Sequence, residues 1–406
     1  MIISGQFNDS LPPIMDGVAI TARNYAYWLN RNHAPSFAIG PKVPEYQDED
    51  RNILRFQSLR LKAADPYRLG FPRVDREFNK LIEEIPFDLV HAHCPFVSGN
   101  YAYTLAQKRK IPMVTTFHSK YRDDFANWMR LDVMVNQAVK FIVNFYEQAD
   151  AVWVPNEAII ETLREYGYRG PVEYVPNGSD IALAADEDRK KLADRGREIL
   201  KANEAVPVLL YLGQQRWVKN LKLLIESLAI LKQQGIQYQM RMVGNGSDLE
   251  EIRELVERRG LDNLVRFTGP VYDREELRAV FAASDLMLFP SLYDNASLAT
   301  REAAGFAIPT VFVNGATTAN GIIDGKNGFL AENEPEEYAS KIRSLLSDPG
   351  KIKAAGLGAR EYLYISWEEI ASQVYGKYEE IVARFKHRQI NGILGQEKQA
   401  EHNSAG

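Results

Sequence analysis

The chain of 406 residues has little of several features that would assign it to a class at once. Its single cysteine, Cys94, excludes a disulfide framework and a structural zinc site made from a cysteine cluster. Its 54 acidic residues outnumber its 49 basic residues, and the net charge of −5 gives no overall attraction to nucleic acid. It has no apolar run of 18 residues, and residues 1–5 are too short for the core of a signal peptide. We therefore expect a cytoplasmic protein without nucleic acid as a partner.

The composition that is present is typical of a globular protein. Hydrophobic residues make up 45% of the chain and charged residues 25%, which excludes disorder as its main state. At about 150 residues per domain, the length predicts two or three domains.

Short apolar runs alternate with amphipathic segments twice along the chain. This alternation is typical of doubly wound α/β domains, whose parallel strands are covered by helices on both faces. We predict one such domain over residues 1–180, a linker near residues 177–200, and a second domain over residues 201–365. The predicted strands are residues 36–40, 53–56, 88–91, 112–116, 150–154 and 172–175 in the first domain, and 208–213, 239–243, 264–269, 286–290 and 310–313 in the second.

The C-terminal segment begins with a helix signal. Ser366 is followed three residues later by Glu369, which is the spacing of a capping box, and apolar residues then recur on one helical face. We predict a helix over residues 366–388 that packs back on the first domain. Residues 389–406 are polar, and we expect them to be disordered.

Ligands of open α/β sheets bind at the carboxyl ends of the strands. Two doubly wound domains supply two such edges, so we expect the domains to face each other across a cleft that holds the site.

The most informative segment is residues 290–309. A predicted strand ends at Pro290, a turn follows at Asp294, and a helix begins near Ser297 and carries Glu302. Backbone N–H groups at a helix start can bind a phosphate, and Asp294 could accept hydrogen bonds from hydroxyl groups. The alternative interpretation is an ordinary turn aspartate followed by a solvated glutamate.

This segment resembles the Glu-x7-Glu motif of glycosyltransferase family 4, whose members are retaining enzymes of the GT-B fold. Asp294 and Glu302 stand at its two acidic positions. Other motifs of the family follow in the same order along the chain, at residues 16–18, 91–93, 95–96, 116–119, 176–178, 213–220, 243–246, 267–269 and 324–328.

The resemblance implies roles for individual residues. The N-terminal domain would take the acceptor and the C-terminal domain a nucleotide sugar, with no cofactor and no metal. Glu302 would bind the nucleotide ribose, Asp294 the hydroxyls of the donor sugar, and Lys219 the diphosphate. The remaining donor contacts would come from Gly17, which allows close approach of the phosphates, from the backbone of Ser297 and Leu298 at the distal phosphate, and from the backbone at Val271 near the base.

Two positions depart from the family pattern. Gln214 stands where the family usually has an arginine, and a glutamine brings no charge to the phosphates. Arg216, two residues further on, could supply that charge. Asp294 replaces the more usual glutamate, which shortens the reach of the carboxylate by about 1.5 Å.

His118 follows a predicted strand, and the resemblance implies that it touches the donor sugar. We therefore predict that the catalytic residues are His118, Asp294, Lys219 and Glu302, although His118 could instead be a structural histidine. His91 and His93 have the spacing of metal ligands, but no cluster of carboxylates or cysteines accompanies them, so we predict no metal site. Cys94 is predicted to be a buried thiol, and residues 48–50 a solvated charge run.

The acceptor side is suggested by residues 117–125, which resemble the corresponding segment of diacylglycerol and glycolipid glycosyltransferases. His118, Lys120 and Tyr121 would lie there. Residues 51–73 contain six basic residues and one acidic residue, a local charge of +5, with aromatic and leucine side chains between them. This segment could lie peripherally on an anionic membrane, on its inner face, or could be a solvated loop.

These observations favour a retaining transferase that moves a hexose, expected to be glucose from UDP-glucose, to a lipid or membrane-linked acceptor such as diacylglycerol or a glycolipid. A transferase with a soluble acceptor, a nucleotide-sugar epimerase and a catalytically impaired sugar-nucleotide-binding subunit are the alternatives. The joint presence of the four predicted catalytic residues argues against the impaired subunit.

Overall fold

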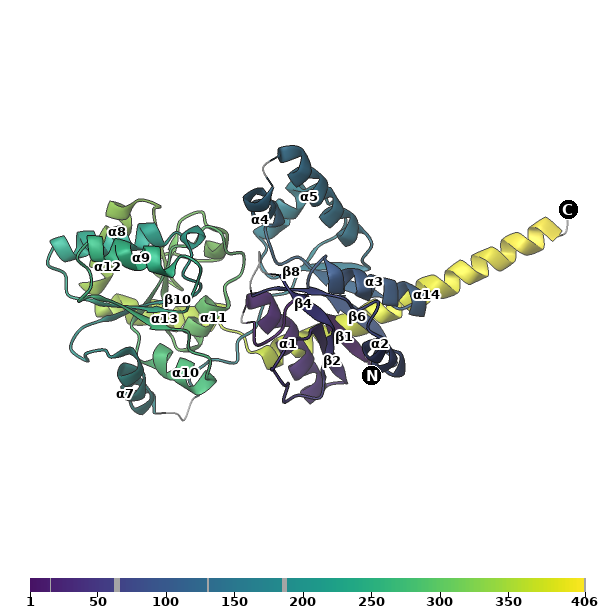
Figure 1. Ribbon diagram of the computed structural model, residues 1–406, viewed down its shortest axis with the longest axis horizontal. Helices are drawn as coiled ribbons and strands as arrows, with labels where there is room; N and C mark the ends of the chain where they lie inside the picture. Colours follow the sequence, from purple (N-terminus) through teal and green to yellow (C-terminus); the bar gives the residue numbers. More distant parts are fainter. Residues whose placement is uncertain (15, 62–65, 130, 185–187, 405–406) are drawn as a thin grey trace. The chain divides into compact units, whose positions relative to one another are not determined.

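The computed structural model describes residues 1–14, 16–61, 66–129, 131–184 and 188–404, which form two compact units (Figure 1). Unit 1 comprises Met1–Asn177 and Trp367–Gly406, and unit 2 comprises Gly178–Ser366. The chain therefore passes between the units twice, after Asn177 and after Ser366.

Unit 1 is built on a seven-stranded parallel sheet with the strand order β3-β2-β1-β6-β7-β8-β9. The order reverses between β1 and β6, which makes this the topological switch point of a doubly wound sheet. The strands are β1 (Ser4–Phe7), β2 (Ser36–Pro41), β3 (Ile53–Phe56), β6 (Leu89–Ala92), β7 (Met113–Thr116), β8 (Ala151–Val154) and β9 (Glu173–Tyr174). Strand β1 was not among the predicted strands because its four residues include Ser4 and Gln6 and lack an apolar run.

A short antiparallel hairpin and seven helices complete unit 1 within its described residues. The hairpin pairs β4 (Ser58–Arg60) with β5 (Arg68–Gly70). The helices are α1 (Gly17–Asn32), α2 (Arg76–Glu84), α3 (Val97–Arg109), α4 (Tyr121–Trp128), α5 (Asp132–Glu147), α6 (Ile159–Glu165) and α14 (Trp367–Ser404).

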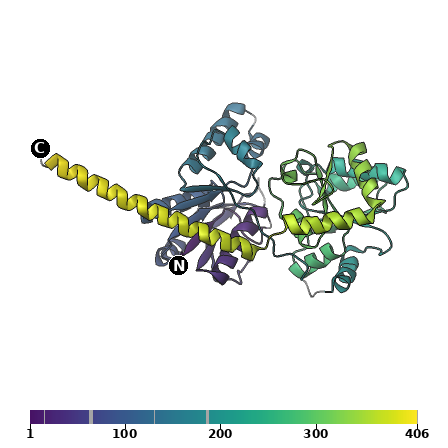
Figure 2. The same cartoon turned by 180° about the vertical axis from the view of Figure 1, so that it is seen from behind.

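Helix α14 returns the C-terminal segment to unit 1, where it packs against α1 and lies along the unit (Figure 2). Lys377 pairs with Glu173 of β9 at 2.9 Å, and Arg388 pairs with Asp150 at 2.6 Å. The helical backbone continues to Ser404, which differs from the disorder expected from residue 389. Glutamine, glutamate, lysine and alanine are frequent in this segment, and their high helix propensity lets a helix that is already anchored continue.

Unit 2 contains a six-stranded parallel sheet with the order β12-β11-β10-β13-β14-β15, in which the switch point lies between β10 and β13. The strands are β10 (Val208–Leu212), β11 (Gln239–Val243), β12 (Val265–Gly269), β13 (Leu286–Phe289), β14 (Thr310–Val313) and β15 (Phe329–Ala331). The helices are α7 (Arg189–Leu200), α8 (Leu221–Gln233), α9 (Leu249–Arg258), α10 (Arg274–Ala282), α11 (Leu298–Gly305), α12 (Pro335–Leu346) and α13 (Pro349–Leu363).

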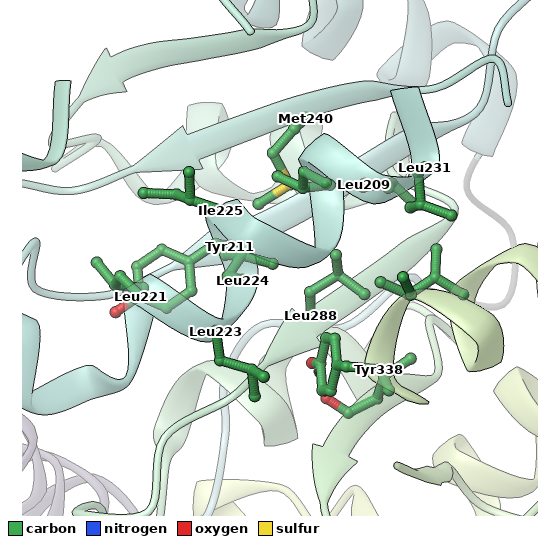
Figure 3. Packing of buried hydrophobic residues seen from close by; sticks show 14 of the residues in the cluster. Leu209, Tyr211, Leu221, Leu223, Leu224, Ile225, Leu231, Met240, Leu288 and Tyr338 are labelled. Atoms are coloured by element: carbon green, nitrogen blue, oxygen red, sulfur yellow. Dashed lines mark hydrogen bonds between the residues drawn. The ribbon is translucent and has the colours of Figure 1, made fainter. Parts of the chain in front are cut away.

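Both faces of the central strand of the unit 2 sheet, β10, are apolar. Leu209 and Tyr211 of β10 point toward α8 and α12 in the core drawn in Figure 3. Val208 and Leu210 of the same strand belong to a second core formed with α7, α10 and α11. This arrangement explains the apolar runs in the sequence, because a strand covered on both faces needs no polar alternation.

Helix α7 lies in the segment predicted as a linker, and the structure assigns it to unit 2, packed against α10. Asp188 caps it by accepting hydrogen bonds from the N–H groups of Lys190 and Lys191. A Cβ at Gly196 would lie 1.9 Å from the carbonyl oxygen of Ala279, so the two helices meet at backbone contact. Helix α7 was not predicted because few of its residues are apolar and buried and most of the others are charged.

Candidate functional site

The candidate donor site lies at the switch point of unit 2, where the loops after β10 and β13 leave neighbouring strands. The loop after β11 lies against the loop after β10. A Cβ at Gly244 would lie 2.0 Å from the carbonyl oxygen of Gly213, and one at Gly246 would lie 2.3 Å from that of Gln215. These glycines allow the two backbones to touch, which fixes the loop that carries Lys219.

Lys219 and Asp294 are brought together by these loops. Lys219 Nζ lies 2.6 Å from Asp294 Oδ1 and 4.8 Å from the centre of the Tyr293 ring. Lys219 is only 9% exposed, and the next residue, Asn220, adopts the left-handed conformation and donates hydrogen bonds to Pro290 O and Asn333 Oδ1. The lysine charge is therefore held at the strand edge and is balanced by Asp294.

Helix α11 starts beside this pair. Ser297 is its N-cap and accepts a hydrogen bond from the N–H of Thr300, and Leu298 is its first residue. The positive end of the helix dipole and the Lys219 ammonium group thus come from adjoining loops, an arrangement that suits a phosphate group.

Glu302 lies one turn further along α11 and is 7% exposed, so the solvated glutamate of the alternative interpretation is wrong. Its Oε1 accepts a hydrogen bond from Arg274 at 3.2 Å, and Arg274 also pairs with Asp180. Burial raises the pKa of Glu302, the Arg274 charge opposes this increase, and Asp180 adds to it. Arg274 and Asp180 were missed by sequence reasoning, since they lie far from the motif along the chain.

Val271 lies between β12 and α10, in the loop that leads to Arg274, so its backbone belongs to the same edge of the sheet. Gln214 is exposed, Arg216 is half-buried, and Gln215 between them is fully buried. Whether Arg216 compensates for Gln214 stays a prediction.

The candidate acceptor side lies in unit 1, where His118 follows β7. His118 is 9% exposed, and burial lowers its pKa to about 3. Its Nε2 lies 3.2 Å from His93 Nδ1, and the two rings stack. His91, the other histidine of the pair considered for metal binding, bonds the hydroxyls of Tyr378 and Thr116. Within residues whose side chains the structure describes, no group of three or more His, Cys, Asp or Glu is arranged to hold a metal ion.

The other predicted unit 1 residues have different environments. Gly17 is the first residue of α1, and a Cβ built on it would meet nothing within 4 Å. Lys120 precedes α4 and is half-buried. Tyr121 is 5% exposed and packs in an aromatic cluster with Phe117, so the structure places its ring in the core. Cys94 is buried as predicted, and its thiol donates a hydrogen bond to Asp9.

The basic segment 51–73 is not one continuous surface. Arg55 pairs with Asp48 at 2.6 Å, with both side chains largely buried, and Phe56 is fully buried. This pair also contradicts the prediction of a solvated charge run at Asp48, whereas Glu49 is exposed as predicted. Lys62 and Asp65 lie outside the described residues. The exposed apolar side chains of the segment gather on the β4–β5 hairpin and its adjoining residues, and they are Leu59, Leu61, Tyr67 and Leu69.

Among the described helices, none combines the length and the apolar character that crossing a membrane requires.

Two Rossmann-like units with these strand orders define the GT-B class of glycosyltransferase folds, and solved structures share it across the chain. Sucrose-phosphate synthase from Thermosynechococcus elongatus has a TM-score of 0.75 at 20% identity, covering 95% of this chain and 100% of that one. HepE of Anabaena, solved with UDP and glucose, has a TM-score of 0.72 at 16% identity, covering 93% and 99%.

The chain belongs to glycosyltransferase family 4. The family model described as Glycosyltransferase Family 4 matches residues 15–183, and the model described as Glycosyl transferases group 1 matches residues 193–363. The predicted family and fold class are thereby confirmed, and the protein is a glycosyltransferase.

Curated relatives are distant in sequence. The alpha-monoglucosyldiacylglycerol synthase of Streptococcus pneumoniae is 23% identical over 257 residues, which is 62% of this chain and 57% of that protein. The GDP-mannose-dependent alpha-mannosyltransferase of Corynebacterium glutamicum is 21% identical over 92% of this chain and 88% of its own length. A D-inositol 3-phosphate glycosyltransferase of Corynebacterium glutamicum is 23% identical over 74% of each chain.

Proposed function

We propose that this glycosyltransferase transfers glucose from UDP-glucose, with retention of configuration, to a hydroxyl group of a lipid or membrane-linked acceptor. The proposed donor rests on one observation. Lys219 pairs with Asp294 beside the start of α11, at the switch point of unit 2. The name of the Streptococcus relative and the UDP and glucose bound to the HepE structure support this choice of acceptor and donor.

The chemistry requires positive charge where the leaving diphosphate gains negative charge. Lys219 and the N-terminal turn of α11 supply this charge, so we propose that transfer needs no metal ion. Phosphate binding would draw Lys219 toward the diphosphate and release Asp294 to accept hydrogen bonds from hydroxyls of the donor sugar. Glu302, already held in place by Arg274, would bind the ribose hydroxyls. The acceptor hydroxyl would attack from the face that the diphosphate leaves, and no enzymic nucleophile is needed.

A panel of UDP-, GDP- and ADP-sugars tests the donor assignment by calorimetry and by product formation. We expect UDP-glucose to bind and react best. A preference for GDP-mannose would contradict the UDP assignment, and the absence of transfer from every sugar nucleotide would contradict the function.

The membrane half of the proposal rests on the β4–β5 hairpin, which exposes 64% of Leu59 and 43% of Leu69. Leucine side chains beside Arg60 suit the interface of an anionic bilayer. We expect the parent protein to sediment with phosphatidylglycerol vesicles and Leu59→Glu to sediment more weakly. Leu357→Glu, at a position of unit 2 that is 58% exposed, is the matched control and should behave like the parent.

Inositol phosphate is the second candidate acceptor, because several relatives are named D-inositol 3-phosphate glycosyltransferases. Activity on this soluble acceptor together with no vesicle binding by the parent would overturn the membrane proposal and leave the donor assignment intact.

A further inference from the structure

One face of the unit 1 sheet is buried yet polar at its centre. Gln6 of β1 pairs in register with His91 of β6, and their side chains share a face with His93 and His118, which follow at even spacing. Helices α1 and α14 cover this face, since Tyr25 contacts the rings of both His91 and His93, and Tyr378 bonds His91. The opposite face of the same strands is apolar, with Phe7, Val90, Ala92, Met113 and Phe117.

Three of these polar side chains form a continuous chain of hydrogen bonds that includes His118. Gln6 Oε1 lies 3.1 Å from His93 Nε2, and His93 Nδ1 lies 3.2 Å from His118 Nε2. Gln6 and His93 are fully buried. The Gln6 amide is oriented from its other end, because Nε2 donates to Ser4 Oγ at 3.2 Å and to Ser36 Oγ at 3.3 Å.

The position of each proton follows from this orientation. An amide oxygen can only accept, so His93 must carry its proton on Nε2 and donate it to Gln6. Burial lowers the pKa of His93 well below its usual value, which keeps the ring neutral and leaves Nδ1 as an acceptor. The hydrogen bond between the histidines therefore requires the proton of His118 to lie on Nε2, where it is donated to His93.

We propose that Gln6 and His93 are positioning residues that hold His118 in the tautomer with its proton on Nε2, so that Nδ1 accepts a hydrogen bond from a substrate hydroxyl. This inference rests on the proposed function, in which His118 meets the substrates. A neutral nitrogen that accepts a hydrogen bond can hold a hydroxyl of the bound sugar or of the acceptor in place. If it is the acceptor hydroxyl, the nitrogen can also stabilise the positive charge that develops on this hydroxyl as its oxygen bonds to the sugar. In the other tautomer the same nitrogen would be a donor and would repel that hydroxyl hydrogen.

The tautomer can be read directly in the full chain labelled with ¹⁵N-histidine, which has six histidines. Correlations between ring nitrogens and ring protons distinguish the two tautomers, and the His118 signals are assigned by their loss in His118→Asn. We expect the parent to carry the His118 proton on Nε2, and Gln6→Leu to show signals with the proton on Nδ1. A parent with the proton on Nδ1, or no change in Gln6→Leu, would overturn the proposal.

A second pair of variants keeps the test decisive if Gln6→Leu does not fold. His93→Leu removes the acceptor for His118 Nε2, whereas His93→Gln can restore it through its amide oxygen. We expect kcat to fall at least about tenfold in His93→Leu, with KM for the nucleotide sugar within about twofold, and to recover largely in His93→Gln. In serine proteases, loss of the residue that sets the histidine tautomer lowers kcat about 10⁴-fold.

Tyr378→Phe is the matched control, because it removes a hydroxyl that lies 3.4 Å from Gln6 Oε1 without interrupting the path from Gln6 to His118. It should retain both the His118 tautomer and the parent kcat. Equal losses of kcat in His93→Leu and His93→Gln would show a merely structural role. The tautomer measurement needs no substrate, so a parent that transfers no sugar would end the proposed function without deciding the arrangement of these protons.

Discussion

The two units share a strand order but differ in what they bury. In unit 2, both faces of the central strand β10 are apolar, and the charged groups of the candidate donor site pair in the loops and helices that follow the strands. In unit 1, the face under α1 and α14 buries three neutral histidines and a glutamine in one hydrogen-bonded layer. The same kind of sheet therefore carries paired charges beyond its strand ends in unit 2 and a buried layer of hydrogen-bonded polar side chains in unit 1.

The largest expected consequence of this difference is acid lability of unit 1. Burial lowers the pKa of His91, His93 and His118, so below pH 6.5 the unfolded chain binds protons that the folded unit does not. Stability should fall as the pH decreases from about 6.5 toward 3, by up to about 1.4 kcal/mol per pH unit for each histidine. Asp9 and Asp16, whose pKa values are raised by burial, act in the opposite direction and offset part of this loss.

Hydrogen exchange measured by mass spectrometry can compare the two units in one sample. Peptides from β6 and β7 should lose protection at a higher pH than peptides from β10 and β11, which serve as the internal control. Simultaneous loss of protection in both sets, or earlier loss in unit 2, would contradict the comparison.

Substitution of the charged pair should affect catalysis more than it affects stability. Lys219→Ala removes the positive charge expected at the diphosphate, and we expect kcat to fall at least about 100-fold, equivalent to about 2.7 kcal/mol. Lys222→Ala, at an exposed position on α8 three residues away, is the control. Steady-state kinetics with UDP-glucose measures both, and near-parent turnover in Lys219→Ala would remove the phosphate role.

Glu302→Gln should weaken nucleotide binding, since it replaces the buried carboxylate that we propose binds the ribose hydroxyls with a neutral amide. A hydrogen bond to a charged group contributes about 1.5–3 kcal/mol against about 1 for a neutral one, which predicts a rise of about two- to thirtyfold in the Kd for UDP. Glu257→Gln, on the exposed face of α9, is the control for calorimetry. An unchanged Kd in Glu302→Gln would place the ribose elsewhere.

The smallest expected effect is a difference in the free energy of unfolding between variants of two buried glutamines. Gln6 in unit 1 has both ends of its amide bonded, whereas the side-chain amide of Gln215 in unit 2 has no hydrogen-bond partner among the described residues. Gln6→Leu should cost about 1–3 kcal/mol, while Gln215→Leu should change the free energy of unfolding by less than about 1 kcal/mol. Denaturant unfolding measures both values, and equal losses would show that Gln215 is bonded in solution.

The same contrast explains what the sequence could predict. The apolar strands of both units and the family motifs, among them the Asp294–Glu302 spacing, are visible as local patterns, and they predict the fold class and the family. Other contacts have no local pattern in the sequence. Arg274 and Glu302 are 28 positions apart, and the path from Gln6 to His118 begins with a contact between residues 87 positions apart. Strand β1 was not predicted because it lacks an apolar run. Its polar residues belong instead to the buried polar layer.

In the basic segment 51–73, by contrast, a local pattern predicted more exposed charge than the structure has. The charge count over residues 51–73 predicts a basic surface. Arg55, however, is buried against Asp48, which lies seven positions earlier in a run of acidic residues. Charge composition gives a total and says nothing of which side chains pair, so only the hairpin part of that surface remains as a proposal.

The most direct test of retaining glucosyl transfer at the unit 2 site is the anomeric configuration of the product formed from UDP-glucose and diacylglycerol vesicles, measured by proton NMR. We predict an α-linked glucosyl lipid, formed by the parent and reduced at least about 100-fold in Lys219→Ala. A β-linked product would contradict transfer with retention at the unit 2 site, and full activity in Lys219→Ala would contradict the site itself.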